Sequence, residues 1–144
     1  MAAGLSQRLA AVVDALPLDP HMRVLEIGCG PGAATRAVAA RLTTGHVMGI
    51  DRSGAAIAQA VAGSAAEIGT GRLSFRQVAA EDFVLDDADS PFDLVFAIRV
   101  GALDGRHPRL GERVLRRISA ATNNGARLFI DGGQPLREVP IPRS

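Results

Sequence analysis

Three glycines and an acid lie close together in residues 23–32. This stretch is RVLEIGCGPG, so Glu26 stands two positions before the loop Gly28-Cys29-Gly30-Pro31-Gly32. Glycine permits backbone conformations and close approaches that a Cβ would forbid. A glycine loop that leads into a helix also presents free N–H groups to an anion such as a carboxylate or phosphate. The stretch therefore predicts a binding loop for a ligand with a negatively charged group, the alternative being a glycine-rich turn without a ligand.

A second acid, Asp51, ends the apolar run at residues 46–50. In nucleotide-binding α/β folds, a carboxylate at the end of the second strand accepts hydrogen bonds from the ribose hydroxyls. Asp51, with Arg52 beside it, is therefore a candidate for holding a nucleoside. The alternative is that Asp51 caps a helix that starts near Ser53.

Alternating strand and helix patterns supply the elements that position these residues. We predict helices at about 4–15, 35–42 and 54–68 and from 110 to a turn at 123–125, with strands at 24–27, 46–51, 73–78, 92–98 and 126–131. This alternation predicts an α/β fold with a doubly wound, mainly parallel sheet, helices on both faces and strand order 3-2-1-4-5. The loop after the fourth strand follows at the carboxyl edge of the sheet, where such folds place their chemistry.

The order of these segments resembles class I S-adenosylmethionine (SAM)-dependent methyltransferases over residues 20–131. Residues 26–32 are similar to the family motif E/D-x-G-x-G-x-G, residues 92–95 (FDLV) to its fourth strand and residues 126–131 to its fifth. The resemblance implies SAM as cofactor: the loop with Gly28, Cys29, Gly30 and Gly32 embraces its amino-acid end, and Glu26 helps to hold its ammonium group. The alternative is an NAD-dependent oxidoreductase, because Gly28-x-Gly30-x-x-Ala33 also fits the dinucleotide fingerprint. Glu26 and the FDLV strand favour SAM.

The resemblance also implies an adenine-binding segment at residues 79–83. The family usually has an aspartate where this chain has Ala79, so the match is incomplete there. Glu81, or else Asp82, and the main chain around Ala80 are left to recognise adenine, unless both acids are solvated loop residues. The end of the fourth strand, which includes Ala97, is expected to border SAM and the acceptor.

The loop at residues 99–109 (RVGALDGRHPR) holds the acceptor-side candidates Arg99 and His107. Because histidine titrates near neutral pH, His107 could act as a general base; the alternative is ordinary surface chemistry before a helix. Cys29 in the glycine loop could be a nucleophile, but no His or acid is assigned to activate it, so we interpret it as a small residue in a crowded turn. Three aspartates at positions 86, 87 and 89 lack histidine partners, and we expect a solvated loop there and no metal site.

The composition argues against a nucleic-acid-binding protein and against a membrane protein. The chain has 144 residues, 47% of them hydrophobic and 22% charged, with a net charge of +1. No broad basic surface for nucleic acid is implied, and five Phe without Trp or Tyr give little material for stacking bases. No apolar run reaches membrane-spanning length, no signal peptide is recognisable, and a single cysteine fits a reducing compartment. We expect a cytoplasmic protein without a membrane partner.

We expect one domain, with a leading helix and turn at residues 1–19, a core at 20–131 and a Pro-rich tail at 132–144. The fold of the family ordinarily continues with two more strands, one of them antiparallel, which suggests a shortened member. An open edge at the fifth strand would be a pairing liability, so the tail or a second subunit, in a homodimer, should cover it. The expected function is methyl transfer from SAM to an unidentified acceptor, by default a small molecule. The alternative is a noncatalytic SAM-binding regulator or partner subunit.

Overall fold

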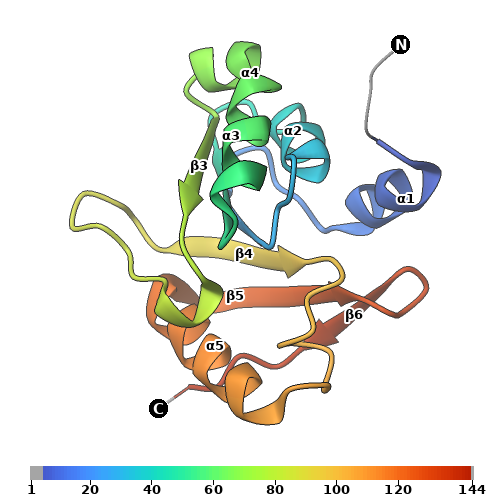
Figure 1. The fold of residues 1–144 in the computed structure, drawn as a ribbon, viewed down its shortest axis with the longest axis vertical. Coiled ribbons are helices and arrows are strands. Elements are labelled where there is room, and N and C mark those ends of the chain that lie inside the picture. The colour runs from blue at the N-terminus through green and yellow to red at the C-terminus, as the bar shows by residue number, and fades with distance from the viewer. Residues whose placement is uncertain (1–4, 144) are drawn as a thin grey trace.

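A six-stranded sheet runs through the computed structural model, which describes residues 5–143 (Figure 1). The first five strands pair with their neighbours in parallel, in the order β3-β2-β1-β4-β5, and β6 lies at the edge next to β5. The predicted α/β class and strand order are therefore confirmed. The strands are β1 (Arg23–Ile27), β2 (His46–Asp51), β3 (Leu73–Gln77), β4 (Phe92–Ala97), β5 (Thr122–Asp131) and β6 (Leu136–Val139).

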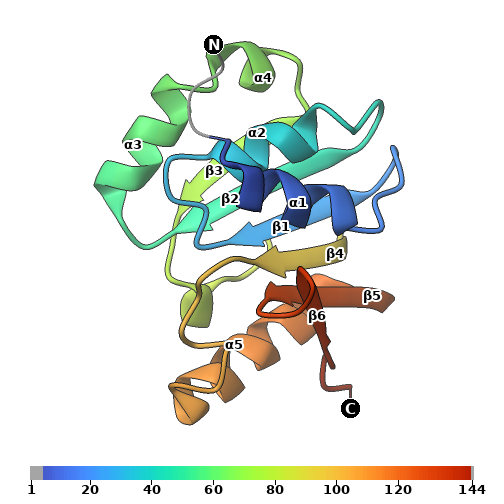
Figure 2. The same cartoon turned by 90° about the vertical axis from the view of Figure 1, so that its right-hand side faces the viewer.

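Helices cover both faces of the sheet. On one face α1 (Gln7–Ala15) and α2 (Ala33–Ala39) lie next to each other (Figure 2) and bury an apolar cluster with the side chains of the central strands. On the other face α5 (Pro108–Ala121) and the short 3₁₀ helix η1 (Ala80–Asp82) cover a second cluster. Successive side chains of a strand point to opposite faces. Val24 of β1 therefore lies in the cluster with α2, and Leu25 lies in the cluster with α5.

The single helix expected at residues 54–68 is wrong, because the chain breaks into α3 (Gly54–Ala62) and α4 (Ala65–Gly69). Gly63 ends α3, and the buried hydroxyl of Ser64 accepts a hydrogen bond of 2.9 Å from Nη1 of Arg36 in α2. The same nitrogen donates to the Pro31 carbonyl at 3.0 Å. The break between the helices thus places Ser64 where it holds the Arg36 side chain, and Arg36 in turn bonds the backbone of the glycine loop at Pro31.

The turn expected at residues 123–125 is also wrong. Helix α5 passes directly into β5 at Thr122, and the extra residues form a bulge between the pairs Phe92–Thr122 and Leu94–Arg127. Asn123 Nδ2 donates a hydrogen bond of 2.6 Å to Asp93 Oδ1, which holds the bulge against β4. Side-chain bonding to the neighbouring strand therefore replaces the turn that the Asn-Asn-Gly sequence favours.

The Pro-rich tail contains a strand that the sequence analysis did not predict. Residues 136–139 pair antiparallel with β5, from Leu128–Val139 to Asp131–Leu136, so the sheet has six strands where five were expected. Pro135 and Pro140 flank this strand without interrupting it. The tail therefore covers the edge of β5 and supplies an antiparallel strand that was expected to be missing.

Deleting residues 134–144 should expose the hydrogen-bonding edge of β5 and make the chain associate with itself. We expect the truncated chain to elute earlier from a size-exclusion column as its concentration rises, whereas the elution of the intact chain changes less. A truncated chain that elutes like the intact one across the whole concentration series would contradict this role of β6.

Candidate functional site

The glycine loop after β1 has the unusual backbone that its sequence predicts. The φ angles are +70° at Gly28, +54° at Gly30 and +89° at Gly32, in the left-handed region that favours glycine. A Cβ at Gly28 would lie 2.9 Å from Val100 Cγ2, so the loop packs closely on the segment after β4. A Cβ at Gly30 would meet nothing within 4 Å, so the middle of the loop is open.

Asp51, at the end of β2, fixes the glycine loop from the neighbouring strand. Its Oδ2 accepts the Gly30 N–H at 2.9 Å and its Oδ1 accepts the Ser53 N–H at 2.9 Å. The N-cap of α3 is Ser53, whose hydroxyl accepts the Ala56 N–H. The alternative role of Asp51 as the helix cap is therefore wrong, and its carboxylate holds the loop at the carboxyl edge of the sheet.

Glu26 is a buried acid in the central strand. Its exposed fraction is 3%, and Thr35 Oγ1 of α2 donates a hydrogen bond of 2.6 Å to its Oε1. None of the ion pairs among residues 5–143 includes Glu26. Burial raises the pKa of Glu26 from 4.5 to about 8, and the nearby charge of Asp51 adds to this while the Thr35 hydrogen bond opposes it. Glu26 is thus protonated at neutral pH, and a cation beside it would favour its ionised form.

Two cavities meet along the carboxyl edge of the sheet. The smaller, about 210 Å³, is bordered by Glu26, the glycine loop and Leu9 of α1. The larger, about 490 Å³, is bordered by Asp51, the η1 segment and the loop after β4. Gly28 and Arg99 border both cavities. In the smaller cavity, Glu26 is an acid without a cation among the described residues, which suits the amino-acid end of a ligand. In the larger cavity, Asp51 is a carboxylate at the end of a strand, which suits a nucleoside. The two cavities together therefore fit a ligand with an amino-acid group at one end and a nucleoside at the other.

The structure brings most of the predicted site residues to these cavities. Those that border neither are Gly32, which packs against Phe75; Asp82, which is exposed; and Ala97, which is buried in the core. The predicted residues at the smaller cavity are Glu26, Gly28, Cys29, Gly30 and Arg99. Those at the larger cavity are Gly28, Asp51, Arg52, Ala80, Glu81, Arg99 and His107.

Cys29 has the character of a packing residue. Its side chain is buried, and burial together with the charges of Glu26 and Asp51 raises the pKa of the thiol to about 12. A thiol that stays protonated is a poor nucleophile. The chemistry of Cys29 therefore agrees with its interpretation as a small residue in a crowded turn.

The sequence analysis assigned no role in the site to three residues that lie near the cavities. Leu9 of α1 borders the smaller cavity and Arg106 borders the larger one. Asp131, at the end of β5, accepts hydrogen bonds from Arg8 of α1 and from the backbone of Arg99. Asp131 could have been found from its place at the end of the strand predicted at residues 126–131, because the carboxyl ends of parallel strands meet at one edge of the sheet.

Residues 5–143 contain no group of three or more His, Cys, Asp or Glu side chains arranged to hold a metal ion. Asp86 and Asp89 of the acidic turn pair instead with Arg76 and Arg23. In the same part of the chain, no helix has the length and apolar character needed to cross a membrane.

Replacing Glu26 by Gln should stabilise the protein at alkaline pH. Glu26 ionises near pH 4.5 in the unfolded chain but near pH 8 in the folded one, so its contribution to stability is lost as the pH rises through this window. Glu26→Gln keeps an oxygen for Thr35 but has no charge to bury. We expect it to raise the free energy of unfolding by about 1–3 kcal/mol at pH 8, and by less at pH 5, measured by urea denaturation. A variant that is less stable than the unmodified chain at pH 8 would contradict the burial of an ionisable Glu26.

Comparison with known proteins places this geometry in a family. The sequence matches the family described as "Methyltransferase domain" over residues 18–140. Trans-aconitate 2-methyltransferase from Streptomyces avermitilis is 40% identical over 87 residues, a match that covers 60% of this chain and 31% of that protein. The chain thus spans less than a third of the length of this relative.

Solved structures share the fold. A SAM-dependent methyltransferase from Geobacter sulfurreducens in complex with S-adenosylhomocysteine has a TM-score of 0.65 at 23% identity, covering 86% of this chain and 47% of that one. The [4+2]-cyclase SpnF has a TM-score of 0.67 at 26% identity, covering 85% of this chain and 42% of that one. Because the family match spans most of the sequence, the chain belongs to the methyltransferase domain family, with the fold of a class I SAM-dependent methyltransferase.

Proposed function

We propose that this chain binds SAM and transfers its methyl group to a small-molecule acceptor. The observation that carries the proposal is the buried Glu26 carboxyl, which borders the smaller cavity beside an open glycine loop and pairs with no cation among residues 5–143. A buried acid without a charged partner is unfavourable in an empty protein, and an ammonium group of a ligand supplies the partner that it lacks. NAD has no such ammonium group, so this feature favours SAM.

The residues of the site would bind different parts of the cofactor in the two cavities. Glu26, Gly28 and Gly30 would hold the amino-acid end, while Cys29 and Gly32 shape the loop. Asp51 would accept the ribose hydroxyls, with Arg52 beside it. The main chain of Ala80 and the side chain of Glu81 would contact adenine, and Glu81 is preferred to Asp82 because Asp82 does not border the cavity.

Methyl transfer requires little acid–base chemistry from the protein. The bound cofactor supplies a methyl group on a sulfonium, which is already activated, so the protein aligns the acceptor and excludes water. Arg106 and His107, after β4, border the larger cavity and are the proposed acceptor-side residues, with His107 as the candidate base. Since a named relative is a trans-aconitate methyltransferase, trans-aconitate is the first acceptor to test.

A second candidate function is ligand binding without methyl transfer. The observation that favours a role other than methyl transfer is that the [4+2]-cyclase SpnF, which is named for a different reaction, shares this fold. Binding and catalysis must therefore be measured separately.

Calorimetric titration with S-adenosylhomocysteine, with NAD as the control, tests the cofactor assignment. We expect saturable binding of S-adenosylhomocysteine and none of NAD, because only the former carries the ammonium that Glu26 lacks. Binding of NAD alone would contradict the proposal. Incubation with methyl-labelled SAM and trans-aconitate or a panel of other small acceptors should then give labelled product. Cofactor binding without labelled product from any acceptor would favour the noncatalytic alternative.

A further inference from the structure

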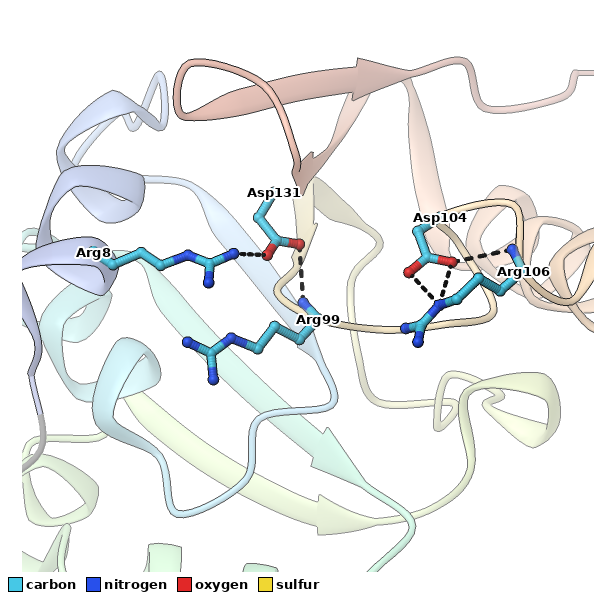
Figure 3. Close-up of polar contacts among 5 residues, drawn as sticks. All are labelled: Arg8, Arg99, Asp104, Arg106 and Asp131. Atoms are coloured by element: carbon cyan, nitrogen blue, oxygen red, sulfur yellow. Dashed lines mark hydrogen bonds and ion pairs between the residues drawn. The ribbon is translucent and has the colours of Figure 1, made fainter.

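Arg99 lies where the two cavities meet. It borders both of them, and its side chain is exposed. Its guanidinium takes part in none of the ion pairs among residues 5–143. Figure 3 shows this side chain extending from the end of β4 toward the side on which Arg8 and the glycine loop lie, and away from Arg106. Arg99 therefore presents a free cation to the smaller cavity.

The backbone of Arg99 is held in a conformation that an arginine seldom adopts. Its φ is +58°, the one positive value at a non-glycine residue within 5–143. The Arg99 N–H donates a hydrogen bond of 2.9 Å to Oδ1 of Asp131, at the end of the neighbouring strand β5 (Figure 3). Unfavourable backbone conformations persist where the surroundings enforce them, often at functional sites. The hydrogen bond to Asp131 is a contact that holds the backbone of Arg99 in this conformation.

Asp131 has a second partner, which leaves the charge of Arg99 available. Its Oδ2 accepts a hydrogen bond of 2.9 Å from Nη2 of Arg8 in α1. The side chain of Asp131 is 14% exposed and that of Arg8 is 58% exposed. Asp131 therefore receives its neutralising cation from Arg8 and contacts Arg99 through the backbone. The same contact ties α1, whose Leu9 borders the smaller cavity, to the end of β5.

The two ionisable groups of the smaller cavity match a zwitterion. Glu26 lies buried in the central strand and suits an ammonium, whereas the exposed Arg99 suits a carboxylate. Arg106 differs, because its Nε is already held by both oxygens of Asp104, at 3.0 and 2.8 Å, and it borders only the larger of the two cavities. Arg99 therefore suits the cofactor side, whereas the sequence analysis expected it on the acceptor side.

We propose that Arg99 binds the carboxylate at the amino-acid end of the cofactor and that Asp131 is the positioning residue for Arg99. The proposal rests on the proposed function, since it requires SAM in these cavities. It assigns a cofactor contact to the segment after β4, in addition to the glycine loop.

A pair of ligands separates this role from a general effect on the site. S-adenosylhomocysteine carries the carboxylate, whereas 5′-methylthioadenosine keeps the nucleoside and the sulfur but lacks the amino-acid group. Arg99→Gln should weaken binding of S-adenosylhomocysteine about tenfold or more, the loss expected for a charged hydrogen bond, and leave binding of 5′-methylthioadenosine unchanged. Arg137→Gln, at an exposed arginine of β6 outside both cavities, is the matched control and should change neither affinity.

Unchanged binding of S-adenosylhomocysteine by Arg99→Gln, or equal weakening of both ligands, would overturn the role of Arg99. If the unmodified chain binds neither ligand, the proposed function fails and this inference fails with it. If the unmodified chain binds both ligands and only the Arg99 comparison fails, the proposed function stands. The two failures are thus distinguishable in one titration series.

The positioning role of Asp131 is tested by asking whether the effect of changing Asp131 requires Arg99. Asp131→Ala should weaken binding of S-adenosylhomocysteine, and Asp131→Asn should restore most of the affinity because its amide oxygen can still accept the Arg99 N–H. The double variant Asp131→Ala with Arg99→Gln should bind no more weakly than Arg99→Gln alone, since a residue that acts through Arg99 has no effect without it. Fully additive losses would overturn the positioning role.

Discussion

A carboxyl group buried in the central strand is the constraint on which the rest of the site depends. Glu26 lies in β1 between Gly49 of β2 and Phe96 of β4, and within residues 5–143 its carboxyl accepts one hydrogen bond, from the neutral hydroxyl of Thr35. Burying such a group opposes folding unless it stays protonated or gains a cation. A buried ionisable group with a shifted pKa is typical of functional sites. At such sites the folded protein is less stable than it would be with a residue chosen for packing alone. The glycine loop, α2 and the smaller cavity all lie around this one carboxyl.

Two aspartates at strand ends fasten the loops that surround it. Asp51 of β2 accepts the N–H of Gly30, and Asp131 of β5 accepts the N–H of Arg99. In both cases a carboxylate at the carboxyl edge bonds the backbone of a loop that follows the neighbouring strand, at a residue with positive φ. The loops after β1 and β4 are therefore held before any ligand arrives, which reduces the ordering that binding requires.

The sequence predicted the parallel part of the sheet because buried parallel strands appear as short apolar runs between turn residues. It also predicted the glycine loop and Asp51, whose residue types follow from local backbone and charge. It did not predict β6, since four residues between prolines carry almost no strand pattern. The break after α3 depends on the contact between Arg36 and Ser64, and the place of Arg99 depends on Asp131, 32 positions away. Contacts of this kind are set by the assembled sheet and not by local sequence.

The most direct test of the account is whether binding of the cofactor releases a proton from Glu26. S-adenosylhomocysteine can be titrated calorimetrically at about pH 7 in buffers of different ionisation enthalpy, with 5′-methylthioadenosine as the ligand that lacks the ammonium group. Because Glu26 is protonated at this pH and a neighbouring ammonium favours its ionised form, we predict proton release with S-adenosylhomocysteine and none with 5′-methylthioadenosine. Binding of S-adenosylhomocysteine without proton release would contradict the claim that the buried Glu26 carboxyl receives the cofactor's ammonium group.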